Sequence, residues 1–234
     1  MRRAQGTTHP RALEANQAGK RPVSGVNAWL MSRWAKPVVW VLWLLPLAWL
    51  VWGVLADSLG ANPAEAIIRS TGDWSLRALL LALAVTPVRQ ALQWNGLARF
   101  RRLLGLFAFF YVCLHLLAYC WFDMGWSLSE VLADIVQRPF ILVGMLAALI
   151  LFLLAVTSPQ AVLRAVGGKR WRILHRSVYA AGLLAILHFY WMRAAKNDTQ
   201  EVLWYAAILA VLLGWRLLRH LAARSSGHKQ HSRA

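Results

Sequence analysis

The sequence predicts an all-α integral membrane protein with six transmembrane helices, and two observations support this fold class. Hydrophobic residues make up 59% of the 234 positions, while charged residues make up only 15%, against roughly 25% in an ordinary soluble domain. Six stretches are also predominantly apolar over the length of about 20 residues that a helix needs to cross a bilayer. This composition argues against an ordinary soluble globular protein and against a disordered chain.

The predicted spans form one membrane domain over residues 37–218. We expect a disordered basic tail before it, residues 1–36, and a basic tail after it, residues 219–234. The first span is expected to be a retained helix rather than a cleaved signal, because it is long, Trp-rich and contains Pro46. Translation starts at Met1 or at Met31. The approximate spans are Val38–Ala56, Trp74–Leu92, Leu103–Phe122, Phe140–Thr157, Ile173–Met192 and Val202–Leu218.

Lysine and arginine are unevenly distributed between the predicted loops. With both termini placed in the cytoplasm, 21 of the 26 basic residues lie inside and five lie outside. Because cytoplasmic loops are enriched in Lys and Arg, this count predicts that both termini are cytoplasmic. The net charge of +17 is divided into short clusters between apolar runs, so no continuous stripe is available for a nucleic acid. The acid-rich outer segments, 56–73 and 123–138, are candidate docking surfaces or simply solvated loops.

Three histidines fall inside the predicted spans. His115 lies in the third span, and His175 and His188 lie near the two ends of the fifth. Ionisable groups at membrane depth are costly, so each histidine is a candidate functional residue. Counted from the cytoplasmic helix ends, His115 lies about 18 Å deep and His188 about 22 Å deep. Two imidazoles at similar depth on facing helices can hold an iron from both sides, as in a bis-His haem site.

His175 suggests a second haem nearer the cytoplasmic face, because it lies about 20 Å from His188 along the helix. On an ideal helix these two histidines are about 140° apart, so they share one face only if the helix bends or carries a π-bulge. The third span has no second histidine. Arg101 lies in the third span at the depth expected for the second haem. It can pair with a haem propionate, or it is simply, with Arg102, one of the basic residues that mark the cytoplasmic side. A shared zinc ion is disfavoured by the spread of the three histidines.

Several motifs together resemble those of a known family. They are Asp73-Trp74-Ser75-Leu76-Arg77, Thr86-Pro87-Val88-Arg89, Arg101-Arg102-Leu103-Leu104-Gly105-Leu106 followed by Tyr111 and His115, and Trp171-Arg172-Ile173-Leu174-His175-Arg176-Ser177-Val178-Tyr179 followed by His188. This pattern resembles the haem-binding membrane subunit of the bacterial periplasmic methionine sulfoxide reductase system, the MsrQ/YedZ family of the ferric-reductase-like transmembrane superfamily. The resemblance covers roughly residues 38–218.

The resemblance implies a six-helix b-type cytochrome of the bacterial inner membrane. It implies one or two haem b groups with His115, His175 and His188 as ligands, and also FMN, whose site residues are not identified. Electrons would come from a quinol or a cytosolic flavin reductase. They would pass to a periplasmic molybdopterin-containing subunit that reduces methionine sulfoxide in oxidised proteins. Catalysis would therefore take place on the partner of a heterodimer, and this chain would transfer electrons without being an enzyme itself.

Other functions remain open from the residues alone. A stand-alone cytochrome of the ferric-reductase type would reduce a small acceptor, such as a ferric chelate, directly. A haem-free transporter or proton path would use the three histidines, although the predicted spans contain no pair of carboxylates for a proton relay. A passive membrane anchor would leave the buried histidines unexplained. A haem spectrum of the purified protein distinguishes the cytochromes from the haem-free alternatives.

Overall fold

The computed structural model describes residues 25–194 and 197–231. Within these ranges the regular secondary structure is helical and contains no strand. Six helices there are long and apolar enough to cross a membrane. The predicted fold class and multi-pass architecture are therefore confirmed. The first 24 residues of the predicted N-terminal tail lie outside the described ranges.

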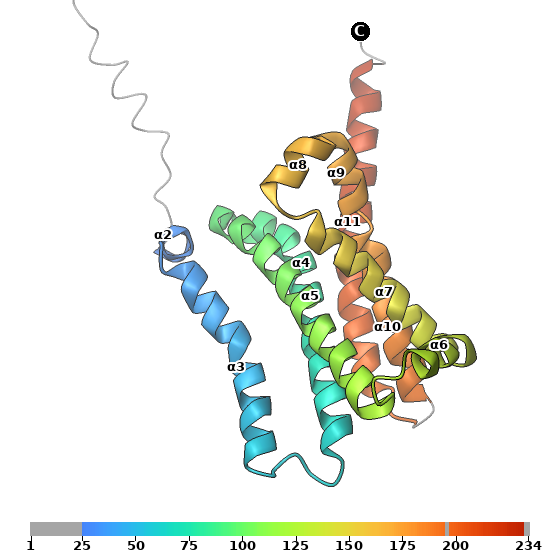
Figure 1. Cartoon of the computed structure of the whole chain (residues 1–234). Coiled ribbons are helices and arrows are strands. Elements are labelled where there is room, and N and C mark those ends of the chain that lie inside the picture. The colour runs from blue at the N-terminus through green and yellow to red at the C-terminus, as the bar shows by residue number, and fades with distance from the viewer. Residues whose placement is uncertain (1–24, 195–196, 232–234) are drawn as a thin grey trace, which may run out of the picture.

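Figure 1 shows the helices as an elongated bundle, with α3 standing beside the others. Their order along the chain is α2 (Gly25–Met31), α3 (Ala35–Leu55), α4 (Pro63–Leu92), the 3-10 helix η1 (Asn95–Phe100), α5 (Arg101–Ala118), the π-helical turn η2 (Tyr119–Asp123), α6 (Leu128–Gln137), α7 (Pro139–Val156), α8 (Gln160–Val166), α9 (Gly168–His175), α10 (Val178–Ala194) and α11 (Gln200–His231).

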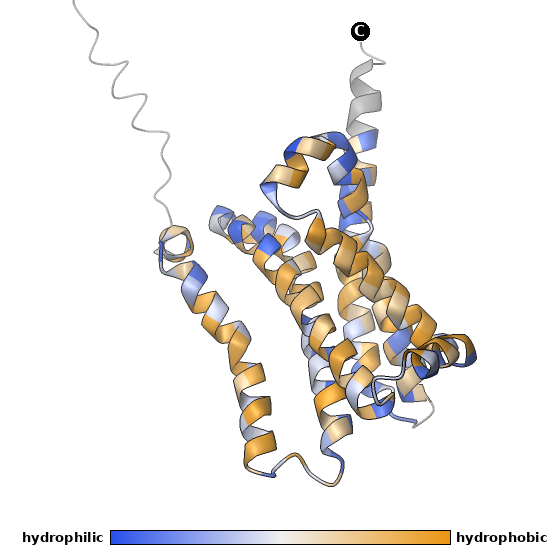
Figure 2. Ribbon diagram, in the orientation of Figure 1, coloured by the Kyte–Doolittle hydropathy of each residue, from blue (hydrophilic) through white to orange (hydrophobic). Residues whose placement is uncertain are grey.

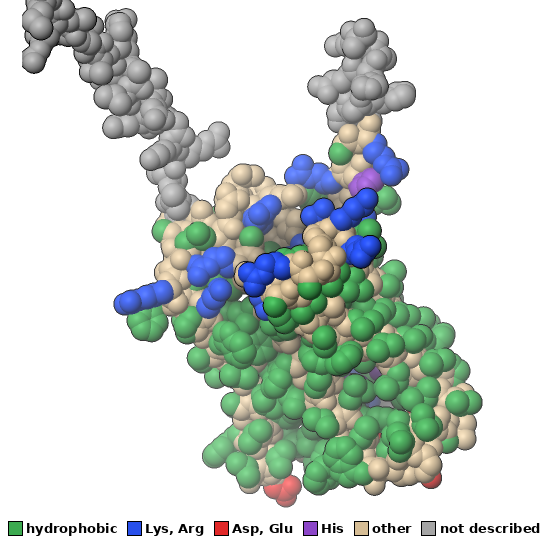
Figure 3. Space-filling view, turned by 45° about the horizontal axis from the view of Figure 1, so that its top comes forward, with side chains coloured by type: hydrophobic (Ala, Val, Ile, Leu, Met, Phe, Trp, Pro, Cys, Tyr) green, Lys and Arg blue, Asp and Glu red, His purple; other side chains and the backbone are tan. Residues whose placement is uncertain are grey.

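The two ends of the bundle differ in charge (Figure 3). We call one the basic end; it holds the starts of α3 and α5, the end of α11, and the short helices α8 and α9 (Figure 1). We call the other the acidic end; it holds α6 and the starts of α4, α7 and α11. This separation is what the positive-inside rule leads one to expect. The placement of the basic end in the cytoplasm stays a prediction.

Two helix pairs form the centre of the bundle. α4 packs along α5, and α7 packs along α10, while α11 covers α10 and α4. Small residues let these backbones approach closely, as is typical of membrane helices: Ala78, Ala108 and Ala181 are all fully buried. The Ser75 hydroxyl also donates to the Ala108 carbonyl oxygen over 2.9 Å, which joins α4 to α5. The space between the two pairs is where the site described below lies.

α3 is attached to the bundle mainly through aromatic side chains. Trp43 stacks on Phe107, with ring centres 5.8 Å apart, and packs edge-on against Trp74. The Tyr111 hydroxyl donates to the Trp43 carbonyl oxygen over 2.6 Å, and Tyr111 is fully buried. Apolar residues run along the rest of α3 (Figure 2). Large side chains such as Trp49 are exposed on it, which fits a helix that faces lipid.

Helix α4 begins well before the predicted span, at Pro63 rather than Trp74. The Asn62 side chain accepts a hydrogen bond from the Glu65 backbone N–H over 3.1 Å, and proline is favoured in the first turn of a helix. Hydropathy missed this part because its first turns carry Glu65, Arg69 and other polar residues. Most of the outer segment 56–73 therefore belongs to helix α4, a candidate membrane span, and not to a loop.

Other predicted boundaries also differ from the structure. Residues 25–36, placed in the tail by their polarity, contain α2 and the start of α3, and α11 continues past Leu218 to His231. The fifth predicted span is broken, because α9 ends at His175 and α10 begins at Val178. Hydropathy marks only the apolar part of a helix, whereas backbone hydrogen bonding continues into its polar ends.

Candidate functional site

A cavity of about 500 Å³ lies between the two helix pairs and is lined by both His115 and His188. The charged lining residues lie at the acidic end, and we call this part of the cavity its mouth, while the lining farther toward the basic end is mostly apolar. The apolar lining includes Leu79, Ala147, Ala148, Leu151 and Ala185. The polar lining includes Asn62, Glu65, Arg69, Asp123 and Arg138. The cavity thus suits a ligand that is itself apolar at one edge and polar at the other.

The two histidine rings face each other across this cavity. Their centres are 6.3 Å apart, and their planes are nearly perpendicular at 82°. A metal–imidazole bond is about 2 Å long, so two rings bound to one metal from opposite sides have centres roughly 6.4 Å apart. The observed separation therefore fits a single metal ion between His115 and His188. The pairing expected from their membrane depths is the one that the structure forms.

Each ring is held from behind by a backbone carbonyl. Nδ1 of His115 donates to the Ile68 carbonyl oxygen over 2.8 Å, and Nδ1 of His188 donates to the Phe140 carbonyl oxygen over 2.7 Å. Because a carbonyl oxygen only accepts, the proton is on Nδ1, and Nε2 of each neutral ring keeps a free lone pair. Metal-binding histidines usually have this second hydrogen bond, which fixes their tautomer and orientation.

A glycine makes room for each ring one helical turn beyond its carbonyl. Gly72 follows Ile68 by four residues, and Gly144 follows Phe140 by four. A Cβ atom would lie 3.1 Å from Nδ1 of His115 at Gly72, and 2.7 Å from Nδ1 of His188 at Gly144. Residues four apart share a helix face, so a side chain at either glycine would push the imidazole away from its carbonyl.

The role of these two glycines could not be predicted from the sequence. The only sequence signal was a glycine in a membrane helix whose neighbouring positions carry larger side chains. Such a glycine more often reflects close packing between helices. The carbonyls of Ile68 and Phe140 carry no sequence signal at all, because every residue has one. These parts of the site became recognisable only once the histidine rings were placed.

His175 lies outside the cavity, at the end of α9. Its ring stacks on that of Trp171, with centres 3.8 Å apart. Its Nε2 is 3.2 Å from the Thr157 hydroxyl, and Trp171 Nε1 donates to the Thr157 carbonyl oxygen over 2.8 Å. Arg101 begins α5 at the basic end, within electrostatic range of His175, and it does not line the cavity either. The structure thus brings His115 together with His188, and it leaves His175 and Arg101 outside the cavity at the basic end.

Two carboxylates expected in outer loops belong to the interior. Asp73 lines the cavity from within α4, beside Gly72. Asp134 on α6 is buried, accepts a hydrogen bond from the Tyr119 hydroxyl over 2.5 Å and pairs with Arg138. These two acidic groups are therefore not available to a docking partner in the way that the segments 56–73 and 123–138 suggested. They were misplaced because residue type alone does not show which way a helix faces.

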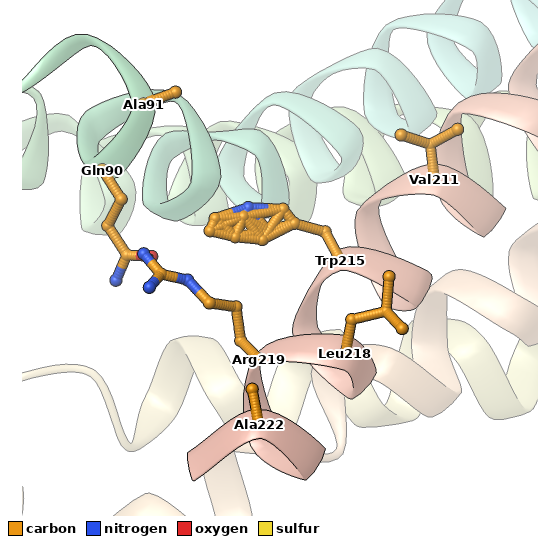
Figure 4. A pocket seen from close by; sticks show the side chains of 7 residues that line it. All are labelled: Gln90, Ala91, Val211, Trp215, Leu218, Arg219 and Ala222. Atoms are coloured by element: carbon orange, nitrogen blue, oxygen red, sulfur yellow. The ribbon is translucent and has the colours of Figure 1, made fainter. Parts of the chain in front are cut away.

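A second hollow is an open groove of about 600 Å³ at the basic end. It lies between the last turns of α4 and the later part of α11 (Figure 4). The Arg219 guanidinium lies 4.6 Å from the centre of the Trp215 ring and donates to Gln90 Oε1 over 3.1 Å. None of the described residues that line this groove is a histidine, and none of them lines the histidine cavity.

Comparison with known proteins defines the class first. Residues 71–186 match the family described as "Ferric reductase like transmembrane component". This match includes His115 and His175 and ends two residues before His188. Nearly half of the chain is thus similar to the transmembrane component of ferric reductases.

Relatives at high identity define the particular family. One, named "Protein-methionine-sulfoxide reductase heme-binding subunit MsrQ", from Polaromonas naphthalenivorans, is 54% identical over 200 residues, which cover 86% of this chain and 91% of the relative. Proteins of the same name from Herminiimonas arsenicoxydans and Azospira oryzae are 52% identical over 159 residues (68% of this chain and 73% of the relative) and 46% identical over 188 residues (80% and 79%). The chain belongs to the MsrQ family, which confirms the resemblance seen in the sequence.

Proposed function

We propose that this chain is the haem-binding, electron-transferring membrane subunit of a methionine sulfoxide reductase system. The observation that carries the proposal is the pair His115 and His188, spaced for one metal ion and each holding its Nδ1 proton on a backbone carbonyl. The names of the relatives, which call them heme-binding subunits of that system, support it. The amphipathic cavity adds the shape and polarity that a haem requires.

In this proposal His115 and His188 bind haem b through Nε2. The bound haem supplies a carrier that accepts and releases one electron at a time. The chain itself holds both imidazoles through Nδ1, and apolar side chains such as Leu79 and Leu151, which line the cavity, would exclude water from a bound haem. Burial, hydrogen bonds to the ligands and nearby charges are the features by which a protein sets a haem potential.

We further propose a second haem position at the basic end, with His175 as a ligand and Arg101 as a propionate partner. Both residues lie at the basic end and outside the central cavity, which supports this assignment. Nε2 of His175 now contacts the Thr157 hydroxyl, so ligation through Nε2 requires that hydroxyl to release it. Thr157 Oγ1 also donates to the Leu153 carbonyl oxygen over 2.6 Å, so the hydroxyl keeps a partner when the histidine moves.

The direction of electron flow rests on the family resemblance and on the charge asymmetry of the bundle. We propose that the basic end faces the cytoplasm of a bacterium and that the protein lies in the inner membrane. A quinol or a cytosolic flavin reductase would donate the electrons. A periplasmic molybdopterin-containing subunit would receive them and carry out the catalysis. FMN would be a further cofactor, as the resemblance implies.

The test is a dithionite-reduced-minus-oxidised spectrum of the detergent-purified protein, with a pyridine haemochrome assay for haem per chain. The wild type is expected to give a b-type spectrum, and both His115→Ala and His188→Ala are expected to lose the haem held between them. His220→Ala, on the exposed end of α11, is the matched control and keeps full haem content. Unchanged haem in both cavity variants would refute the assignment.

A further inference from the structure

Among the described residues, four arginines lie in the half of the bundle nearest the acidic end, and they form two pairs. Arg77 and Arg193 are tied to α11. Arg193 pairs with Asp198 and, over 3.1 Å, with Glu201, while Arg77 lies 3.7 Å from Glu201. Their positive charges are therefore committed to holding α4, α10 and α11 together.

The other pair, Arg69 and Arg138, lines the mouth of the histidine cavity. Arg69 directly follows Ile68, whose carbonyl holds His115. Arg138 stands two residues before Phe140, whose carbonyl holds His188. Each wall of the cavity therefore supplies one ring-holding carbonyl and one arginine at the polar mouth. Because the arginine is fixed to the same segment as the carbonyl, its position is coupled to that of the ligand ring.

We infer that Arg69 and Arg138 bind the two propionates of the haem, so that the propionate edge faces the acidic end. This rests on the proposed function and adds residues to its site. A haem b has an apolar macrocycle and two carboxylates at one edge, which matches a cavity that is apolar at Leu79, Ala148 and Leu151 and polar at its mouth. Guanidinium groups are the preferred partners of carboxylates, to which they can give two parallel hydrogen bonds.

Both arginines already have a carboxylate neighbour, but each guanidinium keeps N–H donors for a second partner. Arg69 lies 2.5 Å from Glu65, and Arg138 pairs with Asp134. A guanidinium has five N–H donors in a planar fork, so a carboxylate on one edge leaves donors for a propionate on another. Glu65 and Asp134 act as positioning residues that orient the two forks.

The remaining charges at the mouth make the arginines necessary for this orientation. Asp73 and Asp123 also line the cavity, and a propionate near either one would be repelled. Without Arg69 and Arg138, the lining residues that the structure describes would offer two incoming carboxylates several acidic side chains and no lysine or arginine. Both arginine side chains are partly exposed, at 30% and 48%, so solvent screens them and each is expected to change haem affinity about two- to fivefold.

The experiment compares haem b with its dimethyl ester, in which both propionate charges are removed. Protein prepared under haem limitation is titrated with each compound in detergent, and the Soret band gives the dissociation constants. The wild type is expected to bind haem b about 4- to 25-fold more tightly than the ester, corresponding to two charge-assisted contacts. The double variant Arg69→Gln/Arg138→Gln should lose most of this preference, and each single variant should lose part of it.

Ester binding serves as the folding control. If the double variant folds, it binds the ester about as tightly as the wild type does, and if it does not fold, the two single variants carry the test. Arg164→Gln, an exposed position on α8, should keep the full preference. The midpoint potential of the haem between His115 and His188 gives a second readout, and loss of the positive charges should lower it.

Three results would overturn the inference. The first is a double variant that still prefers haem b over the ester as strongly as the wild type. The second is a preference abolished by Arg101→Gln, which would place the propionates of this haem toward the basic end. The third is a wild type that binds neither compound; that result would remove the proposed function as well, whereas the first two leave it standing.

Discussion

Replacing Gly144 by alanine should disturb haem binding through one hydrogen bond. The new Cβ atom would lie 2.7 Å from Nδ1 of His188, 2.9 Å from Cε1 and 3.2 Å from Cγ. An ordinary contact at this position is 3.4–4 Å, so the ring must withdraw from α7 by several tenths of an ångström. The Nδ1–H bond to the Phe140 carbonyl, now 2.7 Å, would lengthen past the useful range of about 2.7–3.2 Å.

The magnitude follows from the role of that hydrogen bond. Losing a hydrogen bond that orients a metal-binding histidine typically weakens metal binding about 10- to 100-fold. Gly72→Ala is milder, because its Cβ would lie 3.1 Å from Nδ1 of His115 and a small shift relieves the contact. We expect roughly three- to tenfold weaker binding there, which is less than the full loss of such a bond.

Gly105→Ala on α5 is the matched control. Nothing lies within 4 Å of a Cβ atom at that position, and alanine is favoured over glycine in a helix by about 0.5–1 kcal/mol. The assay is a Soret titration of the apoprotein with haem b, alongside the thermal unfolding midpoint. Affinity should fall in the order Gly105→Ala, Gly72→Ala, Gly144→Ala. A Gly144→Ala protein that binds haem as tightly as the control would refute the reasoning.

Three further predictions concern other parts of the molecule. Tyr111→Phe removes the buried hydrogen bond from the Tyr111 hydroxyl to the Trp43 carbonyl oxygen, so thermal unfolding should show a loss of about 0.5–1.5 kcal/mol while the haem spectrum persists. Glu201→Gln removes a carboxylate from the buried Arg193 and should cost about 1–3 kcal/mol, given its partial exposure; an unchanged unfolding midpoint would contradict this. His175→Ala should keep the haem of the central cavity and lose only a second one in the haemochrome assay; complete haem loss would show that His175 is required for the central site.

The sequence predicted the number of spans well, and their ends less well. A span is recognised from the sum of about 20 side chains, so single polar residues do not hide it. A helix end depends on a few local groups, as at Asn62 and Pro63 before α4. Glu65, Arg69 and Asp73 made the start of that helix look like a loop, yet Arg69 and Asp73 line the central cavity.

The pairing of His115 with His188 could be predicted because depth in a membrane is measured by counting residues along a helix. The rotation of each helix about its axis cannot be counted in this way. The rotation of the helix about its axis turns His175 toward Thr157 and Trp171 and away from the central cavity. The break between α9 and α10 resets this rotation, and no pattern in the fifth span had fixed it.

Sequence by itself thus determined the membrane class, the six helices, the charge difference between their ends and the two histidines that meet. These features depend on transfer free energies and helix rise, which act on each residue largely independently of its distant neighbours. Only the tertiary structure decided that Gly72 and Gly144 expose the carbonyls of Ile68 and Phe140 to the rings. A glycine and a backbone oxygen can hold a histidine ring only when another helix places that ring over them.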